Sequence, residues 1–330
     1  MRGRRDPRLT ALGVLGAALL LSLFTVFLHA KALGRGYLEN YQVPRHVAIL
    51  AGDAGNPWQY RVLSAWIVEA AHRLFGALSL HEPLILAFLA VRVLAETLLF
   101  VFAWRYWRAL GSSTAAAFLG LAILGWSVSH ANYGSDLQFS TYFDVLFYVV
   151  AALAVVQNRL VWILPITLLA ALNRESSGFI PLLPLAAWPG AAPEKRARLV
   201  RVAGAGVAIY LAVFAALRLA YGPEPLVLAY GHHPGPDLLA FNVGRARTWI
   251  QLVATFSIVP ALALAGFRRW PPLLRGFFWL LVPAWLVVHA VGAILAETRL
   301  LLGPFTLVLV PGALFLVQGR APEGPPPRPV

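Results

Sequence analysis

Apolar runs long enough to cross a lipid bilayer recur along the whole chain. A membrane-spanning helix needs about 20 consecutive apolar residues. Eight runs approach that length, at 9–30, 84–103, 114–131, 141–157, 202–221, 249–266, 277–295 and 300–317. The pattern therefore predicts an all-α, polytopic integral membrane protein, with residues 1–318 as a single transmembrane helical domain and no soluble domain.

Two further apolar runs, 160–172 and 178–188, are shorter. The polar sequence Asn173-Arg174-Glu175-Ser176-Ser177 separates them. As α-helices, neither run would cross the bilayer without tilt. The sequence leaves two interpretations of 160–189 open: a pair of thin spans or a re-entrant pair. With this pair included, we expect about 10 membrane segments.

The first apolar run follows a basic start and also has two interpretations. Arg2, Arg4 and Arg5 precede it, and Ala30-Lys31-Ala32 matches the small residues of a signal-peptide cleavage site. The apolar length is nearer about 20 residues than the ~7–15 of a signal peptide. We therefore expect a retained first helix.

Composition excludes several classes of protein. The chain is 59% hydrophobic and 12% charged, whereas soluble domains are about half apolar and about a quarter charged. The absence of cysteine excludes disulfides, a thiol nucleophile, cysteine-ligated zinc and iron–sulfur clusters.

The net charge is +13, and the basic residues are distributed as the expected topology requires. With the N-terminus inside, the short inner segments carry more than half of the 27 Lys and Arg residues, as the positive-inside rule requires. This charge would lie beside anionic headgroups, so we expect no nucleic-acid partner. Both termini are expected in the cytoplasm, and the Pro-rich tail 319–330 is expected to be disordered.

The expected outer segments are longer and chemically more varied. They comprise an outer loop at 31–60, an amphipathic segment at 61–78 and an outer loop at 222–248. Within 61–78, Arg61 and Glu69 share one helical arc with other polar residues, and leucine and isoleucine lie opposite. This pattern predicts an interfacial helix. An active site would open on this side of the membrane.

Two charged pairs fall at membrane depth. Arg92 and Glu96 stand at i,i+4, which favours mutual neutralisation but leaves a substrate role open. Arg174 and Glu175 interrupt the pair at 160–189. Irregular polar backbone at that depth indicates a site that lines a wet cavity or is buried in protein.

The outward-facing residues suit transfer from a lipid-phosphate donor. Asp53 lies in a turn rich in Gly, Asn and Pro, beside the aromatic residue Trp58. Glu297 and Arg299 mark the last outer turn, where snorkelling is the alternative interpretation. Arginine binds phosphate through two hydrogen bonds, and a carboxylate such as Asp53 can take the proton of an acceptor hydroxyl.

Three short motifs carry a family resemblance. Gly52-Asp53 followed by Asn56-Pro57-Trp58-Gln59-Tyr60-Arg61, the turn at 172–176, and the turn at 297–300 resemble bacterial polytopic members of the C-type glycosyltransferase (GT-C) superfamily. The resemblance implies that Asp53 is the catalytic base, that 61–78 is the interfacial helix and that the donor is a polyprenyl-phosphate sugar. It also implies that Arg174 and Arg299 clamp the phosphate. The expected substrate- and phosphate-binding set is Arg61, Arg174, Glu175, Glu297 and Arg299.

The chain departs from the family pattern near Asp53. Many members have a second acidic residue close by, whereas here Glu39 and Asp136 are the candidate partners. These two acids, with His232 and His233, form the expected acceptor site. Adjacent histidines without further ligands at a clear spacing do not predict a metal site, and no cofactor is expected.

We therefore expect a glycosyltransferase in the bacterial inner (plasma) membrane. It would move a sugar from a polyprenyl-phosphate donor to an acceptor on the outer side, in contact with membrane lipids. Two alternatives stay open. One is a transporter or flippase of a lipid-linked or small polar substrate, which the interrupted segment 160–189 and the Arg92–Glu96 pair would suit. The other is a non-catalytic membrane assembly factor.

Overall fold

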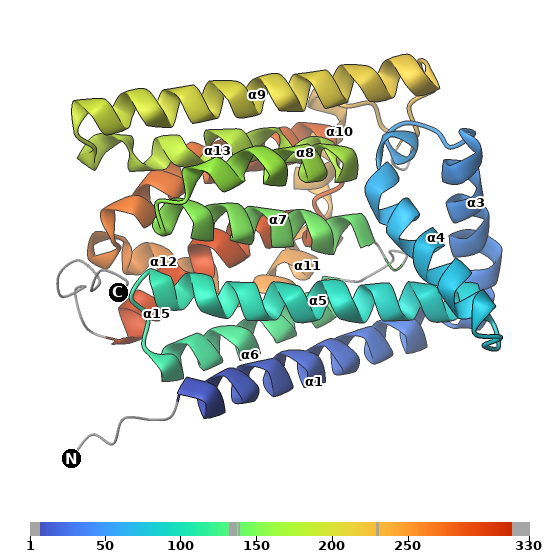
Figure 1. Ribbon diagram of the computed structural model, residues 1–330, viewed down its shortest axis with the longest axis horizontal. Helices are drawn as coiled ribbons and strands as arrows, with labels where there is room; N and C mark the ends of the chain where they lie inside the picture. The colour runs from blue at the N-terminus through green and yellow to red at the C-terminus, as the bar shows by residue number, and fades with distance from the viewer. Residues whose placement is uncertain (1–6, 132–136, 138, 229–230, 319–330) are drawn as a thin grey trace.

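The chain folds into a bundle of helices (Figure 1). The computed structural model describes residues 7–131, 137, 139–228 and 231–318. In these ranges no strand forms, and an isolated parallel bridge pairs Asn56 with Leu226. The elements are α1 (Pro7–Leu33), α2 (Arg35–Tyr37), η1 (Leu38–Gln42), α3 (Val43–Ala51), η2 (Trp58–Tyr60), α4 (Val62–Ala77), α5 (Pro83–Ala109), α6 (Thr114–His130), α7 (Phe139–Val156), η3 (Leu160–Trp162), α8 (Ile163–Asn173), η4 (Glu175–Gly190), α9 (Pro193–Tyr221), α10 (Pro236–Gly244), α11 (Ala246–Phe256), α12 (Val259–Ala265), η5 (Phe267–Arg269), α13 (Pro272–Gly292), η6 (Thr298–Leu301), α14 (Leu302–Pro304), η7 (Phe305–Leu309) and α15 (Val310–Gln318).

The described residues contain 6 helices long and apolar enough to cross a membrane, or 7 if the bent pair α11–α12 counts as one span. They are Thr10–Leu33, Pro83–Ala109, Phe139–Val156, Pro193–Tyr221, Pro272–Gly292 and Thr298–Gln318. Thr114–His130 and Leu160–Asn173 are apolar but shorter. The expectation of an all-helical chain is confirmed for the described residues, and the apolar helices are consistent with a multi-pass membrane protein. The sequence-based number of about 10 segments stays a prediction.

One expected span is bent. The run at 249–266 forms α11 and α12, which meet at an angle of 68°. Ser257, between them, adopts a left-handed backbone conformation with φ of 50°. Pro260 then lies in the first turn of α12, where its missing N–H removes a bond to the preceding turn. Together these two residues end one helix and start another.

The pair at 160–189 forms η3, α8 and η4, and α8 and η4 pack against each other. The Asn173 side chain donates to the Ser140 carbonyl at the start of α7, and η4 returns from there to the start of α9. η4 is a 3₁₀ helix of 16 residues. Because such a helix rises about 2.0 Å per residue, it is about 32 Å long. Pro181 and Pro184 lack the N–H groups that an α-helix would bond.

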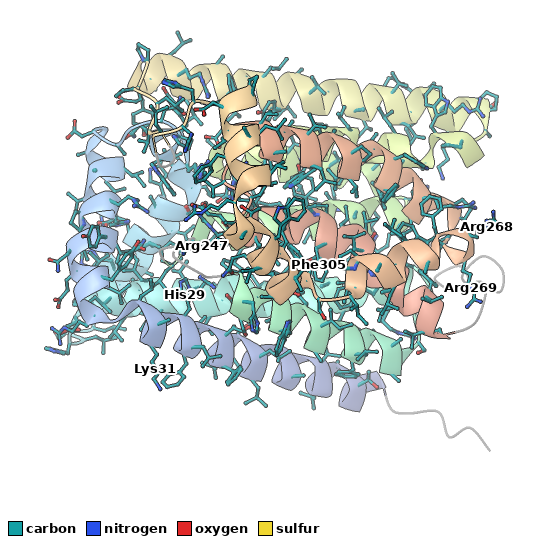
Figure 2. All side chains as sticks on the ribbon, turned by 180° about the vertical axis from the view of Figure 1, so that it is seen from behind. His29, Lys31, Arg247, Arg268, Arg269 and Phe305 are labelled. Carbon is teal, nitrogen blue, oxygen red and sulfur yellow. The ribbon has the colours of Figure 1, made fainter. Side chains whose placement is uncertain are left out.

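The bundle has two chemically different ends. Figure 1 places the start of α1, the end of α5 and the start of α9 at one end. Figure 2 shows Arg268 and Arg269 at this same end, with Lys31 and Arg247 toward the other. We call the first the basic end and the second the cap end. The expected cytoplasmic location of the basic end stays a prediction.

The cap end is more helical than expected. The segment 31–60 was expected as a loop, but it contains α2, η1 and α3. Leu38, Gln42 and His46 are buried at i,i+4 spacing, which gives this segment one inward face. The predicted outer loop 222–248 likewise contains α10 and the start of α11. α4 covers nearly the whole predicted interfacial segment 61–78 and packs against α5.

Candidate functional site

A small cavity lies at the cap end, between α3, the start of α4 and the start of α7. Its volume is about 40 Å³, room for about three water molecules and therefore of the scale of one phosphate group. Its lining residues are Gln42, Arg45, His46, Ile49, Trp58, Arg61, Ser64, Ala65, Phe139 and Ser140.

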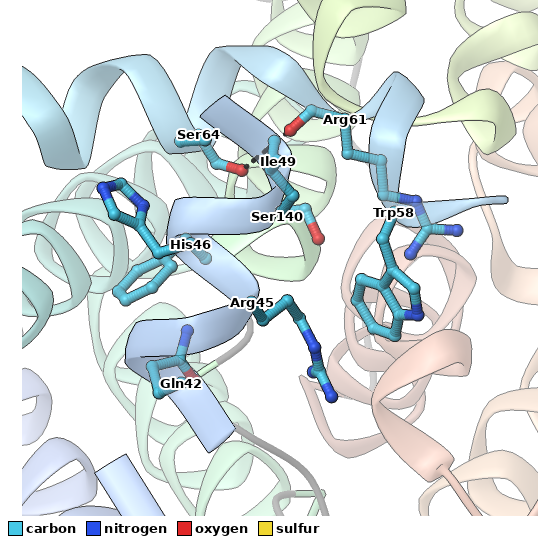
Figure 3. A pocket seen from close by; sticks show the side chains of 10 residues that line it. Gln42, Arg45, His46, Ile49, Trp58, Arg61, Ser64 and Ser140 are labelled. Atoms are coloured by element: carbon cyan, nitrogen blue, oxygen red, sulfur yellow. Dashed lines mark hydrogen bonds between the residues drawn. The ribbon is translucent and has the colours of Figure 1, made fainter. Parts of the chain in front are cut away.

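Trp58 lines this cavity and contacts two of its arginines. Its ring lies between two guanidinium groups, that of Arg45 at 4.5 Å and that of Arg61 at 5.1 Å (Figure 3). The turn that carries Trp58 is held by Gln59. The Gln59 side chain accepts from the Ala54 N–H at 2.9 Å and donates to the Ile49 carbonyl at 3.1 Å. The turn therefore presents Trp58 and Arg61 in a fixed arrangement.

Three arginines from distant parts of the sequence lie close together beside the cavity. One of them, Arg61, also lines it. Arg174 and Arg299 both donate to the Thr141 hydroxyl, at 2.9 and 3.4 Å. Arg61 pairs with Glu175 at 3.0 Å, and Arg299 pairs with Glu297 at 2.5 Å. The structure thus brings together the predicted phosphate-binding residues: Arg61, Arg174, Glu175, Glu297 and Arg299. With Arg45, whose charge interacts with those of Arg299 and Glu297, the four guanidiniums form what we call the arginine cluster.

The arginine cluster has unused hydrogen-bonding capacity. Arg174 and Arg299 are buried. Among the described residues, no partner is found for the buried Nε of Arg299, Oε1 of Glu175 or Oδ1 of Asp144. Buried polar atoms are nearly always hydrogen-bonded in native proteins. These three atoms therefore mark the place where a polar ligand or water is expected.

The charges at this site do not cancel. The four guanidiniums of the arginine cluster face three carboxylates, those of Asp144, Glu175 and Glu297. With all groups ionised, one positive charge is left over. A phosphodiester carries one negative charge and would balance it. Burial also lowers the pKa of Arg45, so an anion beside it would favour its charged form.

Sequence reasoning missed three contributors to this site. Asp144 is buried on α7 and accepts from the Ser176 hydroxyl at 2.7 Å. An acid within an apolar span is a signal of function by itself. Thr141 and Arg45 gave no such signal. Thr141 is chemically unremarkable in sequence, and Arg45 lies on α3 within the expected loop.

Asp53 lies apart from the arginine cluster. It follows Gly52, which ends α3 in a left-handed conformation with φ of 89°. The Asp53 side chain is exposed, does not line the cavity and has no hydrogen-bonding or charged partner among the described residues. Its turn is the one that Gln59 holds, so Asp53 and Trp58 belong to the same rigid segment.

The predicted acceptor-site residues are scattered. Glu39 is exposed and pairs with Arg35 at 2.7 Å. The ring of His232 and the backbone N–H of His233 both contact Asp237, each at 3.0 Å. Asp136 lies outside the described residues. Across the described part of the chain, no group of three His, Cys, Asp or Glu residues could hold a metal ion.

A second ionic group joins α3 to α4. Glu69 accepts from Arg73 at 2.8 Å and contacts His46 and His72 at 3.4 and 3.3 Å. The Arg73 hydrogen bond, followed by those of the two histidines, lowers the pKa of Glu69 to about 2. Burial lowers the pKa of His46. Because His46 also lines the cavity, this group holds one of its walls in place.

The Arg92–Glu96 pair ties three helices together. Both side chains are completely buried on α5. Glu96 also accepts from Thr25 of α1, and Arg92 donates to the Leu137 carbonyl and lies 3.6 Å from the ring of Tyr142 on α7. Both charged groups therefore bind partners within the protein, which favours a structural role for the pair over a substrate role.

The 52–60 turn is also fastened to the segment after α9. Asn56 exchanges backbone hydrogen bonds with Pro225 and Val227, at 3.0 and 2.9 Å. The Tyr60 hydroxyl donates to the Gly222 carbonyl at 2.7 Å. Arg218 lies over the Tyr60 ring at 4.4 Å. We call these contacts the strap.

Comparison with known proteins identified no relative of this chain. No family model, curated protein or solved structure matches the chain significantly.

Proposed function

We propose that this protein is a membrane glycosyltransferase that uses a polyprenyl-phosphate sugar as donor. One observation carries the proposal: Arg61, Arg174 and Arg299 converge from distant parts of the sequence on one buried site at the cap end. Buried arginines without full neutralisation are costly in a membrane protein and mark sites that bind anions. A lipid phosphate would reach the site from the membrane.

The arginine cluster would bind and stabilise the phosphate of the donor. The unpartnered Arg299 Nε–H and the Arg45 and Arg61 guanidiniums offer donors in the planar geometry that phosphate oxygens accept. During transfer, the bond between the sugar's anomeric carbon and the phosphate oxygen breaks, and its electron pair stays on the phosphate. Guanidiniums already in position would stabilise this growing negative charge.

A carboxylate would complete the reaction. The acceptor hydroxyl oxygen forms a bond to the anomeric carbon, and its proton passes to a general base. We assign this role to Asp53, whose exposed and unpaired carboxylate an acceptor can approach. Asp144 is the second carboxylate to test, because one of its oxygens is unpartnered among the described residues and its charge interacts with those of Arg174 and Arg61.

Native mass spectrometry in nanodiscs tests the assignment. We would measure retention of a polyprenyl-phosphate sugar by the wild type and by Arg299→Gln, Asp53→Asn and Asp144→Asn. Arg198→Gln at the basic end is the matched control, because Arg198 is exposed. The proposal expects the wild type, the control and Asp53→Asn to retain the lipid and Arg299→Gln to lose it about tenfold or more.

A turnover assay with an acceptor screen then separates binding from chemistry. Loss of transfer in Asp53→Asn with binding intact supports Asp53 as the base, whereas loss only in Asp144→Asn moves that role to Asp144. If the wild type does not prefer the polyprenyl-phosphate sugar over bulk phospholipid, the glycosyltransferase proposal is wrong. A transporter would instead move the lipid across the bilayer with Asp53→Asn fully active.

A further inference from the structure

A second concave surface shares no lining residue with the cavity described above. It is an apolar groove of about 590 Å³ between α1, α4 and α5, the three helices that Figure 1 shows meeting at the cap end. Leu19 and Leu23 of α1 form one wall. Phe75 of α4 and Ala90 of α5 line the rest. The volume is within the range of about 300–1,000 Å³ that is usual for ligand sites.

The groove is about as long as one leaflet is thick, because on α5 its lining residues run from Leu86 to Thr97, about 17 Å along the helix axis. On α1, Leu19 and Leu23 line the groove. Phe27 and Lys31 are not lining residues but follow on the same face of α1 at i+4 spacing. At about 1.5 Å per residue, Leu19 and Lys31 are about 18 Å apart along the helix axis. The hydrocarbon core is about 30 Å thick, so one leaflet accounts for about 15 Å. The stripe from Leu19 to Lys31 is therefore long enough to reach from the middle of a bilayer to its headgroups.

A cation stands at the headgroup end of this stripe. Lys31 is exposed in the last turn of α1, and Figure 2 shows it at the edge of the bundle. Among the described residues, its ammonium has no hydrogen-bonding or ionic partner. The neighbouring Arg35, by contrast, pairs with Glu39 and Glu82. Of these two described cations, Lys31 is the one without an ionic partner.

We infer that the groove is a binding site for one glycerophospholipid, with an acyl chain against α1, α4 and α5 and its phosphate on Lys31. Charge and length together select this occupant. An acyl chain matches a groove one leaflet long, and the phosphate lies where the chain reaches the headgroups. A long polyprenyl chain would extend beyond the groove. This site is separate from the arginine cluster and does not depend on the proposed function.

Two substitutions test the site, each with a matched control. Ala90→Phe would fill the groove from α5, and Ala208→Phe makes the same change on the exposed face of α9. Lys31→Gln would remove the phosphate contact, and Lys195→Gln removes the other lysine of the chain, at the basic end. Each purified variant would be delipidated stepwise in detergent, and its bound lipids counted by native mass spectrometry.

The expected result is one phospholipid retained after the others are lost. Ala90→Phe should abolish this retention, and Lys31→Gln should weaken it about fivefold, with both controls unchanged. Equal retention in Ala90→Phe and the wild type would overturn the inference. So would an equal loss in the two lysine variants, because the effect would then be general charge attraction. Displacement of the phospholipid by equimolar polyprenyl phosphate would also overturn it and assign the groove to the donor.

Discussion

Gly276 offers a direct test of how η4 packs in the bundle. A Cβ placed on Gly276 of α13 would lie 2.2 Å from the backbone carbonyl oxygen of Ala186 in η4. Backbone atoms of a helix cannot rotate away, so α13 or η4 would have to move by about 1 Å to restore van der Waals contact. Substitution by alanine therefore changes helix packing with the smallest chemical change available.

The magnitude follows from two opposing terms. Overpacking costs about 1–3 kcal/mol, and contact with backbone favours the upper part of that range. Alanine in place of glycine inside a helix returns about 0.5–1 kcal/mol. We therefore expect Gly276→Ala to lower the free energy of unfolding by about 2 kcal/mol. Gly204→Ala on α9 is the matched control, because a Cβ at Gly204 meets nothing within 4 Å. The free energy of unfolding of that variant should rise by about 0.5–1 kcal/mol.

Equilibrium unfolding in mixed micelles, followed by circular dichroism, would measure both variants against the wild type. Opposite signs for the two substitutions are the prediction. If Gly276→Ala is as stable as Gly204→Ala, α13 and η4 are not in the close contact described, and the path assigned to 160–189 is wrong.

Three further predictions concern the polar contacts. Thr141→Val removes the hydroxyl that accepts from two arginines of the cluster, so it should weaken donor binding about tenfold in the nanodisc assay. Unchanged binding would show that Thr141 does not position these arginines. Arg92→Leu and Glu96→Leu should each cost about 3–5 kcal/mol in unfolding experiments, with the double variant losing less than the sum; strict additivity would show that the two charges are not coupled. Glu69 has a pKa lowered from 4.5 to about 2, so its stabilising contribution is present above its unfolded pKa and lost as pH falls from about 4.5 to 2. The unfolding midpoint of the wild type should therefore fall more over this range than that of Glu69→Gln, and parallel pH profiles would contradict the role of Glu69.

Hydropathy was enough to locate most of the bundle. The apolar run at 84–103 falls inside a long helix, and the runs at 141–157 and 277–295 pass the ends of theirs by one and three residues. The agreement arises because a membrane helix must satisfy its backbone internally and expose apolar side chains. The same reasoning could not decide between a thin span and part of a re-entrant pair for 178–188. The length of a segment can be calculated from its number of residues only if the rise per residue is known. Because η4 is a 3₁₀ helix, it is longer than an α-helix with the same number of residues.

The candidate site was predictable only in part. Arg61, Arg174 and Arg299 stand out in sequence because each charge occurs at the end of an apolar segment. Their meeting depends on tertiary contacts with Thr141, a residue with no distinctive sequence signal. Arg45 was missed for a different reason. Its helix, α3, is short, and it belongs to a segment bounded by Gly34 and Gly52, both with positive φ, so the segment resembled a loop.

The strap sets an order of events during synthesis. Tyr60 and its acceptor Gly222 are 162 positions apart, and Arg299 follows its partner Thr141 by 158. At about 5–20 residues per second, each wait lasts about 8–32 seconds. The 52–60 turn must therefore remain without its final contacts while α5 to α9 are inserted, and the arginine cluster closes only when the last turn emerges. A ribosome that stalls or terminates before residue 299 would leave a chain with most of its spans and no completed site.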